Sequence, residues 1–97
     1  MPQPETKYLD IIKTIDLYYK DGPFGMWQLR KHIECDPSHL RRILTRLLTL
    51  KILVKHKIAF NDRVWEVREK EKWEVGRIIR GYESFMLLQK LRRGYKK

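Results

Sequence analysis

The alternation of apolar and polar residues predicts two helices in the first third of the chain. From 8 to 19, apolar residues recur every three or four positions, and a Gly-Pro pair at 22–23 ends the pattern. The short link 24–26 is compatible with a minor strand, and a second helix is predicted over 27–34. We expect this second helix to bury the following apolar residues: Trp27 or Met26, Leu29 and Ile33.

A third helix is predicted from 37 to about 50. Asp36 is a favourable N-cap and Pro37 a favourable first helical residue. With residues placed at intervals of about 100°, the apolar side chains of one face are Leu40, Ile43, Leu44 and Leu47. The opposite face and its flanks are polar and cationic, and consist of Ser38, His39, Arg41, Arg42, Thr45 and Arg46.

A β-hairpin is predicted after the third helix. The segments 53–60 and 63–67 are rich in β-branched and aromatic residues, and Asn61-Asp62-Arg63 between them has turn chemistry. Two pairs of residues alternate along the second strand, and we expect one pair to pack inward: Trp65 with Val67, or Glu66 with Arg68.

The helical period returns from about 69 to 91. One broad apolar face of this last helix contains Val75, Ile78, Ile79, Tyr82, Phe85 and Met86. More apolar side chains lie around the helix than a short domain buries against itself, namely Leu87, Leu88 and Leu91. We therefore expect a domain over 1–70, followed by a C-terminal helix with a basic tail over 71–97.

Composition places this 97-residue chain, with 42% hydrophobic residues, among single globular domains. The lone Cys35 excludes an internal disulfide and favours a reducing compartment. The N-terminus lacks signal-peptide character, and no apolar stretch approaches the roughly 20 residues of a membrane span. We expect a cytoplasmic protein without a membrane partner.

The net charge of +10 indicates a polyanionic partner, of which nucleic acid is the leading candidate. The charge is unevenly placed. Residues 1–50 carry eight Lys/Arg and six Asp/Glu, whereas residues 51–97 carry fourteen and six. Between 37 and 61 there is no acid, while six Lys/Arg accumulate there.

The predicted order of helix, helix, tight turn, helix and hairpin is that of a winged helix-turn-helix domain. The segment QLRKHIECDPSHLRRILTRLLTLKILVKH resembles this family, and the resemblance extends over about 8–68. Family members commonly have Gly where this chain has Lys51, so either the helix end differs or Lys51 adopts a strained conformation. In size and basicity the chain also resembles small winged-helix regulators of archaea and their viruses.

The resemblance implies a sequence-specific regulator of transcription that binds double-stranded DNA and has no cofactor. The helix at 37–50 would enter the major groove, and the wing at 53–68 would contact the flanking backbone or minor groove. Because Arg suits bidentate contacts to guanine, we expect Arg41 and Arg42 to read bases. The full set of expected DNA contacts is Ser38, His39, Arg41, Arg42, Thr45, Arg46, Lys55, Lys57 and Arg63.

Similarity to regulators of the MarR and ArsR types implies a homodimer formed through the last helix and reading palindromic half-sites. The expected interface consists of Val75, Ile78, Ile79, Tyr82, Phe85 and Met86. The alternative is a helix that completes a monomeric core.

Two other functions use the same fold or the same charge. DPSHLRRILTRLLTLKIL also resembles the helical dimerisation modules of small-molecule methyltransferases, in which the fold binds no DNA. An architectural or RNA-binding protein would use the cations without sequence preference. The acid-free run 37–61, which extends from the third helix into the wing, favours specific DNA binding over a pure protein-interaction module.

Catalysis and metal binding are not expected. His32, Cys35 and His39 have side chains that suit zinc, but no fourth Cys or His partner accompanies them. The sequence contains no P-loop, no dinucleotide glycine pattern and no recognisable nucleophile motif. No small-molecule effector is evident either.

Overall fold

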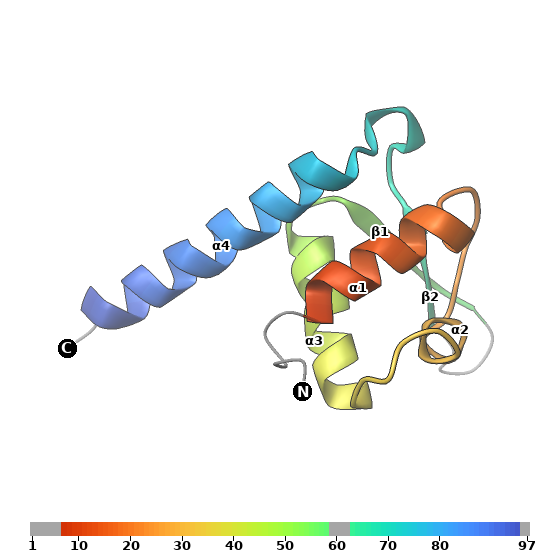
Figure 1. The fold of residues 1–97 in the computed structure, drawn as a ribbon, viewed down its shortest axis with the longest axis horizontal. Helices are drawn as coiled ribbons and strands as arrows, with labels where there is room; N and C mark the ends of the chain where they lie inside the picture. The colour runs from red at the N-terminus through yellow and green to blue at the C-terminus, as the bar shows by residue number, and fades with distance from the viewer. Residues whose placement is uncertain (1–6, 59–62, 96–97) are drawn as a thin grey trace.

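The computed structural model describes residues 7–58 and 63–95 (Figure 1). The chain is mainly helical, with a two-stranded antiparallel hairpin and a long C-terminal helix, as expected from the sequence. Its elements are α1 (Lys7–Thr14), the π-helical turn η2 (Ile15–Tyr19), α2 (Met26–Arg30), α3 (Pro37–Thr49), β1 (Leu53–Lys57), β2 (Arg63–Val67), the 3-10 turn η3 (Lys70–Lys72) and α4 (Val75–Tyr95).

One apolar core joins α1, α2, α3, the hairpin and the first turns of α4. Ile12, Leu29 and Leu44 have no exposed surface, and Trp65 and Tyr82 keep 6% and 2% of theirs. The C-terminal half of α4 extends away from the other elements (Figure 1). The core therefore fixes α3 and the hairpin relative to each other, and only the start of α4 belongs to it.

The predicted start and buried face of α3 are confirmed. The Asp36 carboxylate accepts a hydrogen bond of 3.1 Å from the Ser38 backbone N–H, and Pro37 is the first helical residue. The buried side chains of α3 are the four expected ones, Leu40, Ile43, Leu44 and Leu47.

The end of α3 depends on Lys51, which has a φ of 63°. Its N–H donates to the Leu48 carbonyl at 2.9 Å, and the Ile52 N–H donates to the Leu47 carbonyl at 3.0 Å. This pair of bonds is a Schellman motif, in which the left-handed residue is usually glycine. The strained conformation predicted as one alternative for Lys51 is thus the one observed.

Lys51→Gly is expected to stabilise the fold by about 0.5–1 kcal/mol. A side chain in the left-handed region costs roughly 1–2 kcal/mol, and the greater freedom of glycine in the unfolded chain offsets part of the gain. Urea unfolding measures the change. Lys51→Ala is the matched control, because it removes the amine but keeps the Cβ; an equal gain from both variants would trace the effect to charge and contradict the backbone explanation.

The second helix is shorter than predicted. α2 ends at Arg30, because the chain then tightens into a turn in which the N–H groups of His32 and Ile33 both donate to the Leu29 carbonyl, each at 3.0 Å. Ile33 is still buried, from the turn and not from a helix. Of the two alternatives for the inward residue, Met26 packs against the core and Trp27 is 62% exposed.

The link at 24–26 contributes a single β-bridge instead of a strand. Phe24 and Trp65 exchange two backbone hydrogen bonds, each of 2.8 Å. This bridge attaches the start of α2 to the hairpin, so that α2, α3 and β2 surround one region of the surface.

The inner face of the hairpin is apolar at the end near α3 and cationic at the end near the turn. Leu53 lies opposite Val67, Lys55 opposite Trp65, and Lys57 opposite Arg63, and directly opposed residues of an antiparallel pair share a face. Trp65 and Val67 are buried, so they form the inward pair. The predicted turn at 61–63 lies outside the described residues except for Arg63.

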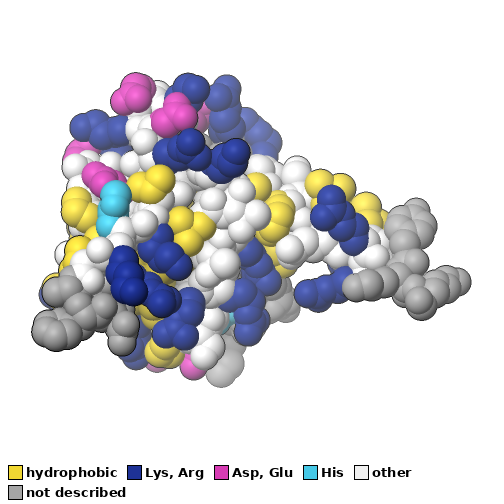
Figure 2. Space-filling model, turned by 180° about the vertical axis from the view of Figure 1, so that it is seen from behind, with side chains coloured by type: hydrophobic (Ala, Val, Ile, Leu, Met, Phe, Trp, Pro, Cys, Tyr) yellow, Lys and Arg dark blue, Asp and Glu magenta, His cyan; other side chains and the backbone are white. Residues whose placement is uncertain are grey.

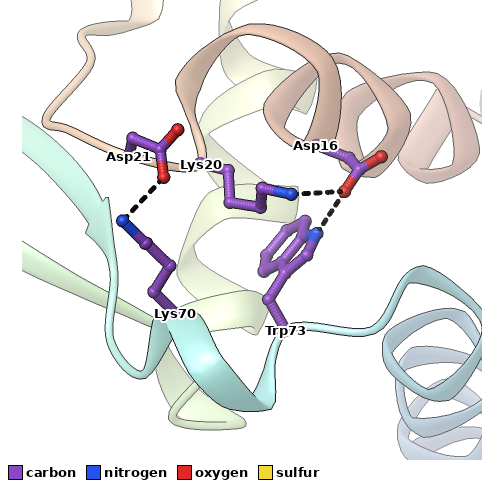
Figure 3. A network of polar contacts seen from close by, with 5 residues as sticks. All are labelled: Asp16, Lys20, Asp21, Lys70 and Trp73. Atoms are coloured by element: carbon purple, nitrogen blue, oxygen red, sulfur yellow. Dashed lines mark hydrogen bonds and ion pairs between the residues drawn. The ribbon is translucent and has the colours of Figure 1, made fainter.

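A polar network ties the segment before α4 to the end of the first helix (Figure 3). The Trp73 indole N–H donates to Asp16 at 2.7 Å, and Lys20 lies 3.9 Å from the same carboxylate. Lys70 pairs with Asp21 at 2.9 Å and lowers the pKa of that carboxyl. These contacts hold the segment before α4 against the end of the first helix.

Candidate nucleic-acid interface

The outer face of α3 carries the residues that the sequence assigned to DNA. Arg41 and Arg42 are exposed, as are Ser38 and Thr45. Because the opposite face of α3 is buried in the core, the helix presents these side chains on one fixed side of the domain. Neither arginine pairs with a carboxylate of the described residues, so both guanidinium groups are available to an anion.

The hairpin contributes further cations to the candidate interface. On the half of its inner face nearest the turn lie three exposed cations, namely Lys55, Lys57 and Arg63. They share this face with buried Trp65 because of the strand register. Glu66, the acid among the described hairpin residues, lies on the other face, where it pairs with His56 at 2.9 Å. The structure thus brings the cations predicted for the wing to one side.

A cavity of about 430 Å³ lies where α2, α3 and the hairpin meet. Among the described residues, four cationic side chains and no acidic one line it. The residues that line it are Met26, Trp27, Arg30, Arg41, Thr45, Lys55, Arg63 and Trp65. Four of these residues belong to the predicted DNA contacts.

The surface seen from behind Figure 1 is strongly cationic. Figure 2 shows Lys and Arg side chains gathered over the middle of this face, while most of its Asp and Glu side chains lie near one edge. The middle of this face is therefore cationic, which favours a polyanionic partner.

Trp27 and Arg30 are cavity residues that sequence reasoning did not single out for binding. The Trp27 ring lies close to Gly25, where a Cβ would come within 2.9 Å of the indole Nε1, and the Lys31 ammonium lies 4.6 Å from the ring centroid. The sequence signals for these two residues were Gly25, two positions before Trp27, and the position of the cation Arg30 three residues after Trp27.

Arg46 differs from the other arginines of α3 because it is half-buried and engaged within the chain. Its guanidinium donates to the Tyr82 hydroxyl at 2.9 Å, and the Tyr82 ring stacks on Tyr8 with 4.5 Å between centroids. The Tyr8 hydroxyl in turn donates to Glu83 at 2.5 Å. Arg46 therefore links α3 to α4, which separates it from the exposed DNA-contact candidates.

The same contacts border a second cavity of about 430 Å³ between α1, α3 and α4. His39 lines this cavity together with Arg42. His39 is half-buried, so this predicted contact lies at the flank of the outer face of α3 and not at its centre.

Tyr8 makes stability pH-dependent in the alkaline range. Burial and the hydrogen bond to Glu83 raise the pKa of Tyr8 to about 12. Between pH 10 and 12 the unfolded chain therefore loses a proton that the folded chain retains, so this contribution is complete below about pH 10 and is lost as pH rises further.

We expect Tyr8→Phe to flatten the fall in unfolding free energy between about pH 10 and 12. Urea unfolding at several pH values in this window measures the slope. Tyr18→Phe, at an exposed tyrosine, is the matched control. Equal slopes for the wild-type chain and Tyr8→Phe would mean that the Glu83 contact does not retain the proton.

The residues whose side chains suit zinc make other contacts within the chain. His32 stacks on Tyr18 with 4.3 Å between centroids and lies 3.1 Å from the Tyr19 hydroxyl. Burial raises the pKa of the Cys35 thiol, which disfavours the thiolate that zinc needs. Within 7–58 and 63–95, no three His, Cys, Asp or Glu side chains are grouped to hold a metal.

The six residues expected at a dimer interface divide into two sets. Ile78 and Tyr82 are buried in the core of the single chain, and the other four are half-buried, namely Val75, Ile79, Phe85 and Met86. The exposed apolar residues of α4 are instead Leu87, Leu88 and Leu91, at 57%, 54% and 49%. With 100° per residue, Leu91 lies directly opposite Tyr82 on the helix.

Comparison with protein families, with curated proteins and with solved structures finds no significant match to the chain. In the part of the chain that the structure describes, no helix has the length and apolar character needed to cross a membrane. The functional assignment therefore depends on the geometry and charge described above.

Proposed function

We propose that this protein is a winged helix-turn-helix regulator that binds double-stranded DNA sequence-specifically. α3 enters the major groove, and the hairpin acts as the wing on the flanking backbone or minor groove. The single observation that carries this proposal is that Arg41 on the outer face of α3 lines one cavity together with Lys55 and Arg63 on the inner face of the hairpin, and that no acidic side chain of the described residues lines this cavity.

The chemistry of this region fits readout of both backbone and bases. Arg41 and Arg42 offer bidentate donors suited to guanine, whereas Lys55, Lys57 and Arg63 are suited to phosphates. A pure protein-interaction module has no need for this concentration of unpaired cations. An architectural protein would need the cations but not the rigid placement of two arginines on α3.

The protein acts as a homodimer in this proposal. Leu87, Leu88 and Leu91 lie on the part of α4 that extends from the core, and they remain exposed in a single chain (Figure 1). Pairing this leucine face with that of a second copy would bury it and place two copies of α3 on one duplex.

Selection from a randomised duplex pool, repeated at 50 and 200 mM salt, tests the function. A dimer with about eight phosphate contacts should lose roughly four orders of magnitude in affinity between the two salt concentrations. We expect a palindromic motif that remains enriched at the higher salt.

Two results would contradict the proposal. Binding that disappears with salt and enriches no motif would indicate an architectural or RNA-directed protein. Absence of binding at low salt would leave the protein-interaction module as the better description.

A further inference from the structure

We propose that the cavity between α2, α3 and the hairpin binds a free nucleotide, with the phosphate on its cations and the base against Trp27. The cavity of about 430 Å³ falls within the range of pockets that hold small ligands. Its occupancy would compete with DNA; this consequence, unlike the binding itself, rests on the proposed function.

The cationic side chains that line the cavity favour the binding of an anion. Arg30, Arg41, Lys55 and Arg63 approach it from α2, α3 and both strands, and none of them pairs with a carboxylate of the described chain. Four neighbouring cations repel one another in the absence of an anion. A phosphate ester can accept hydrogen bonds from several of these donors at once.

The indole N–H of Trp65 is a second, independent observation. This donor is buried and has no acceptor among the described residues, and Trp65 lines the cavity. An unpaired buried donor costs about 1–3 kcal/mol, so a small shift of the cavity wall that let a ligand oxygen reach this N–H would be favoured.

The exposed ring of Trp27 indicates that the ligand also has an aromatic base. The Trp27 side chain lines the cavity and is 62% exposed, although a tryptophan of the core would be buried. Gly25 allows the ring to lie where it does, because a Cβ at this position would come within 3.0 Å of the indole Cδ1. Bases stack on exposed aromatic rings, which distinguishes a nucleotide from inorganic phosphate.

The test uses the three indole N–H signals in the NMR spectrum of the ¹⁵N-labelled full chain, assigned with Trp→Phe variants. AMP is the probe, and adenosine and inorganic phosphate are its two halves. We expect AMP to shift the signals of Trp27 and Trp65 in a saturable way at or below about 1 mM. The Trp73 signal should stay in place, because its N–H donates to Asp16 and Trp73 does not line the cavity. Each half should bind more weakly than AMP.

Arg30→Ala should weaken AMP binding by about tenfold or more, since it removes a charged hydrogen-bond donor. Arg30 is not among the DNA contacts predicted from the sequence, so this variant tests the cavity separately from base reading. Arg77→Ala is the matched control, because Arg77 is exposed on α4 and outside the cavity. A competition assay with the selected duplex then measures whether AMP displaces DNA.

Three results would overturn the nucleotide site: no shift up to about 10 mM AMP, parallel shifts of all three indole signals, or equal weakening by Arg30→Ala and Arg77→Ala. Shifts caused by duplex DNA but not by AMP would also overturn it, because the cavity would then hold only a phosphate of the duplex. AMP binding without any DNA binding would uphold the site and reject the proposed function.

Discussion

Arg42→Ala is expected to weaken binding to the selected duplex by about 1–3 kcal/mol, a loss of roughly 5-fold to 150-fold. Arg42 lies on the outer face of α3, is exposed and has no carboxylate partner among the described residues. In the major groove its guanidinium would bond to two acceptors of one guanine, and alanine leaves both without a partner. We expect Arg41→Ala to have an effect of the same size.

Competition against random duplex DNA measures the specificity of this loss. If Arg42 reads a base, Arg42→Ala should change affinity for random DNA far less than affinity for the selected site. Arg77→Ala changes the charge equally on α4, away from the proposed interface, and should affect both DNAs only slightly. Equal losses by Arg42→Ala on both DNAs would show that Arg42 contacts a phosphate.

Arg46 provides a contrast on the same helix. Because its guanidinium donates to the Tyr82 hydroxyl, its removal breaks a link between α3 and α4. Arg46→Ala should therefore lower stability by about 1 kcal/mol. The two arginines have the same chemistry, and their contacts within the fold give them different roles.

The sequence predicted α3 and the hairpin well because their signals are local. An N-cap followed by proline marks the start of α3, and the helical period identifies its buried face. The alternation that buries Trp65 and Val67 also places Lys55 and Arg63 on their face once the register is known. The cationic surface could be anticipated from these signals and from the acid-free run.

The cavity and the Arg46 contact could not be predicted, because they depend on residues far apart in the sequence. Phe24 and Trp65 meet through a single β-bridge that has no pattern of its own. The early end of α2 in the turn that closes on the Leu29 carbonyl, and the exposure of Trp27, have no local signal either. Helical spacing ranks Trp27 and Met26 equally, and only the position of the hairpin decides between them.

The helical period of the last helix does not distinguish its buried face from its exposed apolar face. Ile78 and Tyr82 pack on the core in the first half of α4, and the exposed leucines lie on roughly the opposite side in the second half. The helical period alone assigns the apolar residues 75–86 to one interface, because no local signal marks where the core ends. The end of the core is a tertiary property, because it depends on which residues of α4 pack against α1 and α3.

Leu88→Glu combined with Leu91→Glu is expected to produce a folded monomer. Both side chains are about half exposed in the single chain, so the fold tolerates the charges, whereas an apolar interface does not. The dissociation constant of the dimer should rise at least about 100-fold, and affinity for a palindromic site should fall towards that for a half-site. Sedimentation equilibrium and circular dichroism measure assembly and folding.

Tyr82→Glu would be a poor test of the same interface. Tyr82 is 2% exposed, stacks on Tyr8 and accepts the hydrogen bond of Arg46, so a carboxylate there would disrupt the core. Lys90→Glu is a better control, since it adds a carboxylate at an exposed polar position between the two leucines. A wild-type chain that sediments as a monomer at tens of micromolar would reject the dimer. A dimer that survives the double leucine substitution would move its interface away from this face of α4.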